Sequence, residues 1–487
     1  MSLEADNHYT ILGVNRQATT EDIQTAFAKL RENELRQADN LDGSAFQQVN
    51  YAYEVLSDPK RRAIYDSLLG EIEEPVLDVK LIASRTQIPI SETEQVFYLR
   101  IDIRPPQQDV PQLPLNLCLV IDRSTSMRGA RLQKVQTAVE LIIKQLGPDD
   151  LLSIVSFSDR AQVVVPSSSI TNQQAILNKI RDIRASGGTE IFQGLREGVE
   201  QLKQIALPDY SNHLILLTDG HTYGDARHCL ELAKDVAPQG INMTAFGIGS
   251  EWNDSFLDDL VAPSGGLSSF IETPAEIIDY LQSRISSLGK IYAQNVRLKQ
   301  DFPNSLALRY GFKLTPFAQP LPLGASDDIS LGDIEGRAPL SLLLELFVQP
   351  QGIPTRINIP LTVTADVPSQ NIRQQTFTNR LQLFVLSDAT EERPSDDILE
   401  AVRLLNLYRM NEKVWADVDD GQVAPAANRM RHLTTRLLEA GQTKLAQQAH
   451  LEAERLAKMG TLSSEGRKRL KYGTRALMTQ TGRLNLG

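Results

Sequence analysis

The fold expected for the middle of this 487-residue chain follows from the segment Pro114-Leu-Asn-Leu-Cys-Leu-Val-Ile-Asp122-Arg-Ser124-Thr-Ser126-Met127. Its first half is an aliphatic run, which is typical of a strand buried on both faces of a parallel sheet. An aspartate and two serines at alternate positions follow that run. Ligands bind at the carboxyl ends of strands in open α/β sheets. We therefore expect these three oxygen-bearing side chains to lie at a ligand-binding edge.

Two later segments could complete such a site. Gly187-Gly-Thr189-Glu190 is a flexible turn that places a hydroxyl at the start of a helix, and His213-Leu-Ile-Leu-Leu-Thr218-Asp219-Gly220 is a second buried-strand pattern ending in an aspartate. Mg²⁺ prefers oxygen ligands in octahedral geometry. Ser, Thr and Asp are also the residues favoured at helix caps and turns, so a purely structural role stays open. The candidate metal ligands are Asp122, Ser124, Ser126, Thr189 and Asp219.

In their order and local context, these five residues resemble the metal-ion-dependent adhesion site of the von Willebrand factor type A (VWA) family. The resemblance covers residues 111–288, where strand and helix patterns alternate as in a doubly wound, Rossmann-like α/β domain. It implies a bound divalent cation, Mg²⁺ or alternatively Mn²⁺ or Ca²⁺. It also implies that an Asp or Glu of a protein partner completes the coordination shell, as in integrins.

Residues 1–70 have the pattern of a small helical unit. Thr19-Thr-Glu-Asp22 predicts a helix start, and two phrases, Tyr9-Thr-Ile-Leu-Gly13 and Tyr53-Glu-Val-Leu-Ser-Asp-Pro-Lys-Arg-Arg-Ala-Ile-Tyr-Asp66, resemble a J-domain. J-domains stimulate a chaperone ATPase through a His-Pro-Asp tripeptide between their two long helices. The corresponding stretch, Leu35-Arg-Gln-Ala-Asp-Asn-Leu-Asp-Gly43, contains neither His nor Pro. The resemblance therefore implies a retained fold without stimulation of a chaperone ATPase.

Residues 75–110 and 291–388 carry strand patterns on either side of the VWA-like segment. An isolated hairpin is marginally stable, so we expect one β-sandwich into which the VWA domain is inserted, similar in layout to the hybrid domain of integrin β chains. Two separate β pieces are the alternative. Residues 393–487 are predicted to be helical. Their basic group is expected on a solvated helix face, with an anion-binding site as the alternative; it comprises Arg467, Lys468, Arg469, Lys471 and Arg475.

Composition narrows the class of protein. Hydrophobic residues make up 41% and charged residues 23% of the chain, which is ordinary for a soluble globular protein. The net charge of −11 argues against binding to nucleic acid or to an anionic membrane. The N-terminus lacks the pattern of a secretory signal and no apolar run is long enough to span a bilayer, so we expect a cytoplasmic protein. Cys118 and Cys229 have no Cys or His neighbours at zinc spacing and are expected to be buried.

These features favour a metal-dependent protein-binding or adaptor protein rather than an enzyme. An accessory or chaperone-like assembly factor for a separately encoded ATPase is the alternative. A metal-dependent hydrolase is disfavoured, because no general base or paired nucleophile accompanies the candidate ligands. His213 and His221 flank the strand that ends at Asp219, but nothing in their spacing indicates catalysis.

Overall fold

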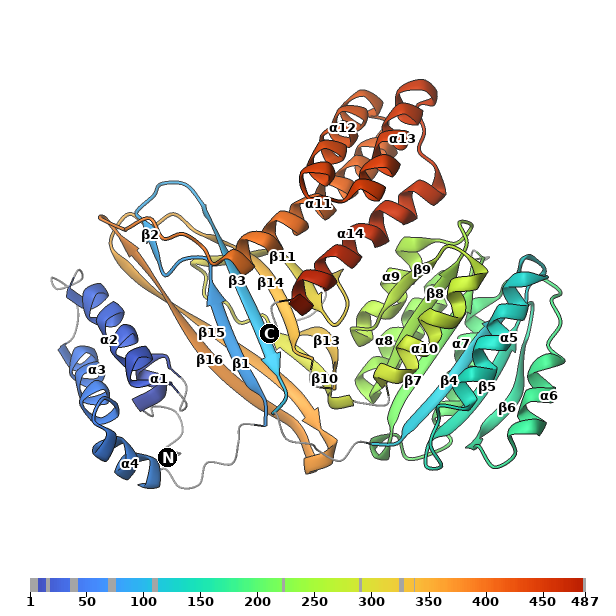
Figure 1. The fold of residues 1–487 in the computed structure, drawn as a ribbon, viewed down its shortest axis with the longest axis horizontal. Helices are drawn as coiled ribbons and strands as arrows, with labels where there is room; N and C mark the ends of the chain where they lie inside the picture. Colours follow the sequence, from blue (N-terminus) through green and yellow to red (C-terminus); the bar gives the residue numbers. More distant parts are fainter. Residues whose placement is uncertain are drawn as a thin grey trace.

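The computed structural model, shown in Figure 1, describes residues 8–14, 18–35, 43–68, 76–106, 113–220, 224–288, 291–323, 328–336 and 338–484. The structure has four regions: N-terminal helices, a pair of five-stranded sheets, a six-stranded sheet between helices, and C-terminal helices. None of the helices within those ranges is long and apolar enough to cross a bilayer.

The six-stranded sheet has the order β6-β5-β4-β7-β8-β9. Neighbours are parallel, except for the antiparallel pair β5 and β6. From β4 the strand order runs through β5 and β6 towards one edge of the sheet, and from β7 it runs through β8 and β9 towards the other edge. The carboxyl ends of β4 and β7 therefore lie at a topological switch point. The strands are β4 (Leu115–Asp122), β5 (Leu151–Phe157), β6 (Ala161–Ser169), β7 (Ser211–Thr218), β8 (Ile241–Ile248) and β9 (Ser268–Ile271).

Helices cover both faces of this sheet (Figure 1). Alternate residues of β4 point to opposite faces, so that Leu119 packs with one set of helices and Val120 with the other. The first set is α5 (Ala130–Ile143), α6 (Gln173–Arg181) and α10 (Ile277–Leu288). The second set is α7 (Ile191–Leu202), α8 (Ala226–Val236) and α9 (Asp254–Val261). Both cysteines are free and buried, as predicted.

Helix α7 lies unusually close to β4. A Cβ at Gly198 would come within 2.7 Å of Val120 Cγ2, and one at Gly194 within 2.6 Å of the Phe157 ring. Only glycine permits this approach, which fixes the position of the loop that precedes α7. The candidate ligand Thr189 lies in that loop.

Strands from before and after the six-stranded sheet share the other two sheets. Strand β3 pairs antiparallel with β14 along its length, and one apolar core contains residues of both sheets. The first sheet has the order β1 (Asp78–Ala83), β3 (Gln95–Arg104), β14 (Leu340–Val348), β11 (Leu306–Thr315) and β12 (Gln319–Pro320). The second has the order β13 (Asp328–Glu335), β10 (Ile291–Lys299), β15 (Thr355–Val367), β16 (Ile372–Leu386) and β2 (Gln87–Pro89).

A buried polar cluster joins the six-stranded sheet to these two sheets. Lys313 of β11 donates through Nζ to the carbonyl of Gly265 at 2.6 Å, and Asp333 of β13 accepts from the Asn242 side chain at 2.7 Å. Burial lowers the pKa of Lys313 to about 8 and raises the pKa of Asp333 to about 7. The charged or titratable members of this junction cluster are His213, Arg284, Lys313, Asp333 and Glu335.

The N-terminal helices pack on a small core of their own. They are α1 (His8–Leu12), α2 (Thr20–Leu35), α3 (Gly43–Leu56) and α4 (Pro59–Leu68). The helix start predicted at Thr19 is confirmed, because the Thr19 hydroxyl accepts the Asp22 N–H at 3.1 Å and Asp22 accepts the Thr19 N–H at 2.8 Å. Residues 36–42, where the His-Pro-Asp tripeptide is missing from the sequence, lie outside the described residues.

The C-terminal helices pack together and against the first five-stranded sheet, where Phe312 and Leu343 join their core. They are α11 (Asp396–Asp419), α12 (Val423–Glu439), α13 (Thr443–Met459) and α14 (Ser464–Leu484). Figure 1 shows α14 running back from this bundle past α9, with its C-terminal end towards β14 and β13, and α14 contacts both β9 and β11.

The prediction of a solvated basic face on these helices is wrong. Lys468, Lys471 and Arg475 are buried in the contact between α14 and the VWA-like region. Lys471 pairs with Asp254 at 2.6 Å and Arg475 pairs with Asp258 at 2.6 Å. The other two are partly exposed, and they pair with the same region too: Arg467 with Asp254 and Arg469 with Glu272. The basic residues are therefore half of an interdomain contact whose acidic half lies on α9 and after β9.

Candidate metal centre

Asp122 is the last residue of β4 and its side chain is buried. One carboxylate oxygen, Oδ1, accepts the Ser124 N–H at 2.7 Å, and the other accepts the Thr218 hydroxyl at 2.7 Å. Burial raises the pKa of Asp122 to about 6, although the Thr218 and Ser124 hydrogen bonds oppose that rise. The carboxylate is therefore fixed in orientation and poorly solvated, a state that a bound cation would relieve.

A short turn brings the two serines to the second carboxylate. Ser126 lies in the 3₁₀ turn η1 (Thr125–Met127), which is anchored by the buried side chain of Met127. The Ser124 and Ser126 hydroxyls are 2.9 Å apart, and Ser126 donates to Asp219 Oδ1 at 2.6 Å. Asp219 directly follows β7, the neighbour of β4. The switch point of the sheet thus places both aspartates at one edge.

Thr189 reaches the same edge from the loop before α7. A Cβ at Gly220 would lie 3.1 Å from Thr189 Oγ1, so the threonine hydroxyl lies beside the backbone that follows Asp219. The loop is held by hydrogen bonds from the Glu190 N–H to the Ser158 carbonyl at 2.8 Å and from the Gly188 N–H to Asp159 Oδ1 at 2.9 Å.

All five predicted residues therefore come together. Two carboxylates and three hydroxyls form an oxygen-only donor set, which suits a hard cation such as Mg²⁺. The Ser126 side is exposed to solvent, while Asp122 is buried. Within the ranges that the structure describes, no cluster of three or more His, Cys, Asp or Glu side chains could hold a metal ion. The candidate centre depends on its hydroxyl oxygens as much as on its carboxylates.

The sequence did not reveal two further residues that contact the carboxylates. Thr218 lies within the strand pattern that ends at Asp219, where its hydroxyl could not be distinguished from a core position. Arg131 bonds Asp219 Oδ2 through Nη1. The local signal for Arg131 is weak: a basic residue in the first turn of a helix opposes the helix dipole, so that an acidic partner would stabilise it.

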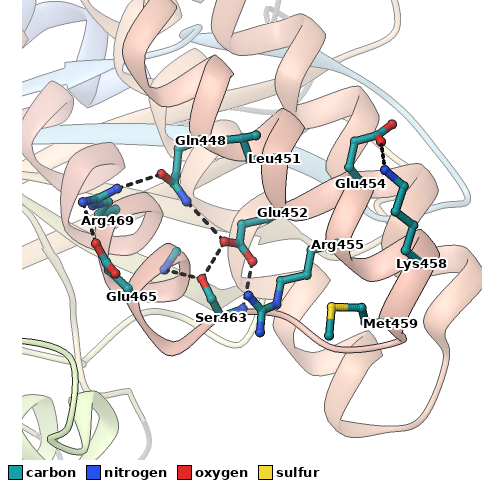
Figure 2. Close-up of a pocket in the computed structure, with 11 residues that line it drawn as sticks. Gln448, Leu451, Glu452, Glu454, Arg455, Lys458, Met459, Ser463, Glu465 and Arg469 are labelled. Atoms are coloured by element: carbon teal, nitrogen blue, oxygen red, sulfur yellow. Dashed lines mark hydrogen bonds and ion pairs between the residues drawn. The ribbon is translucent and has the colours of Figure 1, made fainter.

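A cavity of about 390 Å³ lies elsewhere, between α13 and α14 (Figure 2). Most of its charged groups already have partners: Lys458 pairs with Glu454 at 2.8 Å, Arg469 pairs with Glu465, and Glu452 accepts from the Ser463 hydroxyl. None of the residues that line the cavity belongs to the candidate metal centre.

A doubly wound sheet with carboxylates and hydroxyls at its switch point defines a VWA-type class of domain. The comparisons agree with this class. Residues 116–283 match the family model of the von Willebrand factor type A domain. Residues 7–66 match the model of the DnaJ domain, and residues 396–480 match that of the Sll0103-like C-terminal alpha-helical domain. The VWA and J-domain resemblances are thereby confirmed at the level of the domain.

Among curated proteins, the chain is 28% identical over 369 residues to uncharacterized protein sll0103 of Synechocystis sp., covering 73% of this chain and 86% of that protein. It is 25% identical to uncharacterized protein YfbK of Escherichia coli, covering 54% of this chain and 47% of YfbK. Human inter-alpha-trypsin inhibitor heavy chain H1 is 29% identical, over 41% of this chain and 23% of its own length. The chain thus spans about half of YfbK and less than a quarter of the heavy chain.

Two solved structures show the same fold at 14% identity. The von Willebrand factor type A structure from Catenulispora acidiphila has a TM-score of 0.65 and covers 83% of this chain and 98% of that one. The ArnB paralog VWA2 from Sulfolobus acidocaldarius has a TM-score of 0.53, with 83% and 99% covered.

Proposed function

We propose that this chain is a metal-dependent protein-binding adaptor whose divalent cation captures an Asp or Glu side chain of a partner protein. Asp122, Ser124, Ser126, Thr189 and Asp219 hold the cation, which is Mg²⁺, with Mn²⁺ or Ca²⁺ as alternatives. The observation that carries this proposal is the convergence of these five oxygen donors at one edge of the sheet, with Ser126 open to solvent.

The charge of the centre favours an acidic ligand. Two carboxylates and three neutral hydroxyls leave a divalent cation with little surplus negative charge around it. The bound cation would act as a Lewis acid that accepts one more carboxylate oxygen. The partner's side chain is the natural source of that oxygen, because the exposed edge gives access to another protein.

Three arginines lie at the rim of the centre beside the exposed Asp159, although the whole chain is acidic. Arg128 and Arg160 are exposed beside the loops that carry the ligands, and Arg123 donates only to the neutral Ser186 hydroxyl at 2.8 Å. None of these three guanidinium groups has an acidic partner among the residues that the structure describes. A surface of this kind attracts an acidic segment of a partner and speeds its association.

The centre has an adaptor role rather than an enzymatic one. His213 lies near the start of β7, is buried, and is 3.0 Å from the Ser211 hydroxyl. Burial lowers the pKa of His213 well below its ordinary value, so the ring is neutral. Its position near the start of β7 also keeps it away from the strand end that carries Asp219. The VWA-containing relatives, such as the inter-alpha-trypsin inhibitor heavy chain, support an interaction role.

The VWA domain, residues 111–288, is inserted into a β-sandwich made of residues 75–110 and 291–388. The pairing of β3 with β14 across the insertion supports this layout. A J-like unit at 1–70 and a helical domain at 393–487 flank it. The protein acts in the cytoplasm, without nucleic-acid or membrane partners.

A second candidate is an accessory or chaperone-like assembly factor for an ATPase complex. The match of residues 7–66 to the DnaJ domain favours it. The absence of His-Pro-Asp from the sequence speaks for a docking role of this unit rather than for stimulation of a chaperone ATPase.

Affinity capture from the native cell extract tests the main proposal. Wild type and Asp122→Ala are compared in Mg²⁺ and in EDTA, with Asp149→Ala, an exposed residue just before β5, as the matched control. We expect a partner that is lost with Asp122→Ala and with EDTA but kept by Asp149→Ala. A partner retained under all conditions would refute metal-dependent capture.

A further inference from the structure

Arg131 brings a positive charge into the candidate metal centre. It is the second residue of α5 and points back to the strand ends, where Nη1 bonds Asp219 Oδ2 and lies 3.3 Å from the Ser126 carbonyl oxygen. The Arg131 side chain is 31% exposed, whereas the Asp219 side chain is fully buried. The pair therefore lies at the boundary between the core and the solvent.

The two candidate carboxylates differ in their partners. The hydrogen bonds that Asp122 accepts come from Ser124 and Thr218, which are both neutral donors. Asp219 accepts from the Ser126 hydroxyl on Oδ1 and from the Arg131 guanidinium on Oδ2. Within the part of the chain that the structure describes, Arg131 is the one cationic side chain that contacts either carboxylate. A divalent cation bound at Asp219 Oδ1, on the Ser126 side, would lie beside the guanidinium that holds Oδ2, and a cation that used both oxygens would have to displace Arg131.

The space around Arg131 is limited by the loop after β8. Gly249 has a φ of +74°, and a Cβ there would lie 2.9 Å from Arg131 Nη2. The next residue, Ser250, is fixed from the other side, because its carbonyl accepts from Lys468 Nζ at 2.6 Å and from the Ser464 hydroxyl at 2.8 Å. Lys468 is buried and lies 5.0 Å from the centre of the Trp252 ring.

A continuous set of contacts thus runs from α14 of the C-terminal helices to the candidate centre. Lys468 holds Ser250, Gly249 lies against Arg131, and Arg131 bonds Asp219. With this loop held in place, Arg131 has less room to swing away from the carboxylate.

We infer that Arg131 is a resident counter-charge that competes with the divalent cation for Asp219 and thereby sets the metal affinity of the centre, with α14 limiting its retreat. This inference rests on the proposed function, since it assigns a role towards the same cation. Its physical basis is the repulsion between a guanidinium and a divalent ion that are bound to the same carboxylate group.

The test is calorimetric titration of the full chain with Mg²⁺ or Mn²⁺ alone, without a partner. Arg131→Gln removes the charge and keeps much of the side-chain length, and Arg131→Lys keeps the charge. Lys134→Gln is the matched control, because it removes one positive charge from the next turn of α5, where no contact with Asp219 exists. Circular dichroism checks that each variant is folded, and Arg131→Met is a second neutral variant.

We expect Arg131→Gln to bind the metal roughly tenfold more tightly than wild type, which corresponds to the loss of about 1.4 kcal/mol of repulsion between Arg131 and the divalent ion. Arg131→Lys should stay closer to wild type, and Lys134→Gln should equal it. Equal or weaker binding by Arg131→Gln, with binding by wild type intact, would overturn the inference and leave the proposed function standing. If neither folded wild type nor Arg131→Gln binds metal, the proposed function fails together with the inference.

The part played by α14 is tested by a double-mutant cycle. Lys468→Met removes one of the two hydrogen bonds that hold the Ser250 carbonyl, so metal affinity should rise in the wild-type background by less than it does with Arg131→Gln. In the Arg131→Gln background, Lys468→Met should have no further effect. The same shift in both backgrounds, or none in either, would exclude α14 from the role of limiting Arg131.

Discussion

Replacement of Asp258 by Asn tests how firmly α14 holds the VWA-like region. The Asp258 carboxylate accepts two hydrogen bonds from Arg475, at 3.0 and 2.6 Å, and lies 2.8 Å from Lys471 Nζ. Asn keeps the volume but removes the charge. Arg475 then loses its carboxylate partner, whereas Lys471 keeps Asp254 at 2.6 Å.

The expected loss of stability on Asp258→Asn follows from the burial of the ion pair between Asp258 and Arg475. Removing one partner of a buried ion pair costs roughly 3–5 kcal/mol. The side chain of Asp258 is 23% exposed, which lets solvent compensate part of the loss. We therefore expect Asp258→Asn to lower the free energy of unfolding, or of α14 release, by about 3 kcal/mol. Asp235→Asn, at an exposed position on α8, is the control and should change it by less than about 0.5 kcal/mol.

The loss of stability on Asp258→Asn should also depend on pH. Burial raises the pKa of Asp258, but Arg475 and Lys471 outweigh burial and hold that pKa well below its ordinary value. The stabilisation is therefore present at pH values above the unfolded-state pKa of about 3.9 and is lost as the pH falls below it. The difference between wild type and Asp258→Asn should be largest near neutral pH and shrink in acid.

Hydrogen exchange and fluorescence can measure this release. Trp252 is buried beside α14, with its ring centre 5.8 Å from that of Tyr472, so its emission should shift when α14 leaves. Backbone amides of α14 should exchange faster in Asp258→Asn, by about the factor that corresponds to 3 kcal/mol. Unchanged exchange in α14 together with an unchanged denaturation midpoint would refute the interdomain role of this ion pair.

Three further predictions concern other parts of the chain. Burial raises the pKa of Asp333 to about 7, so the ionisation of this carboxyl opposes folding, and the penalty grows from about pH 4 to pH 7. In thermal melts, Asp333→Asn should therefore be more stable than wild type at pH 7.5, and the difference should be smaller at pH 5. Burial lowers the pKa of Lys313 to about 8, and the Asp333 charge opposes that fall, so the comparison is best made at pH values below 8. Gly265→Ala should lower the free energy of unfolding by about 2 kcal/mol or more, because its φ is +63° and the new Cβ would lie 2.1 Å from the Gly332 backbone nitrogen; a denaturant midpoint equal to that of wild type would contradict this. The full chain should not raise the ATP turnover of a chaperone ATPase that an intact J-domain protein stimulates; stimulation above the basal rate would show that the stretch 35–43 acts without His-Pro-Asp.

The residues of the candidate centre could be predicted from the sequence because each of them lies in a short, recognisable sequence pattern. Asp122 and Asp219 each end an aliphatic run, and Thr189 sits in a glycine turn before a helix. Parallel strands end at one edge, so local patterns suffice to predict that these residues meet. The two domain resemblances rest on local phrases in the same way.

The contacts between domains could not be predicted from sequence patterns in this way. A helix with a basic stripe has the same pattern whether it faces solvent or an acidic helix, and Asp258 lies 217 residues before Arg475. Trp252 carried no usable pattern either, and its role beside Phe270 and Tyr472 emerges only when α14 packs against α9 and β9. The Arg131 contact likewise joins α5 to the end of β7.

The long separation between α9 and α14 has a consequence for the order in which the protein is made. At about 5–20 residues per second, the ribosome needs roughly 10–40 seconds to pass from Asp258 to Arg475. During that interval the nascent VWA-like region carries unpaired acidic side chains and an uncovered Trp252. Helix α14, which is synthesised well after α9, therefore closes this face, and until it emerges the exposed patch is available to chaperones.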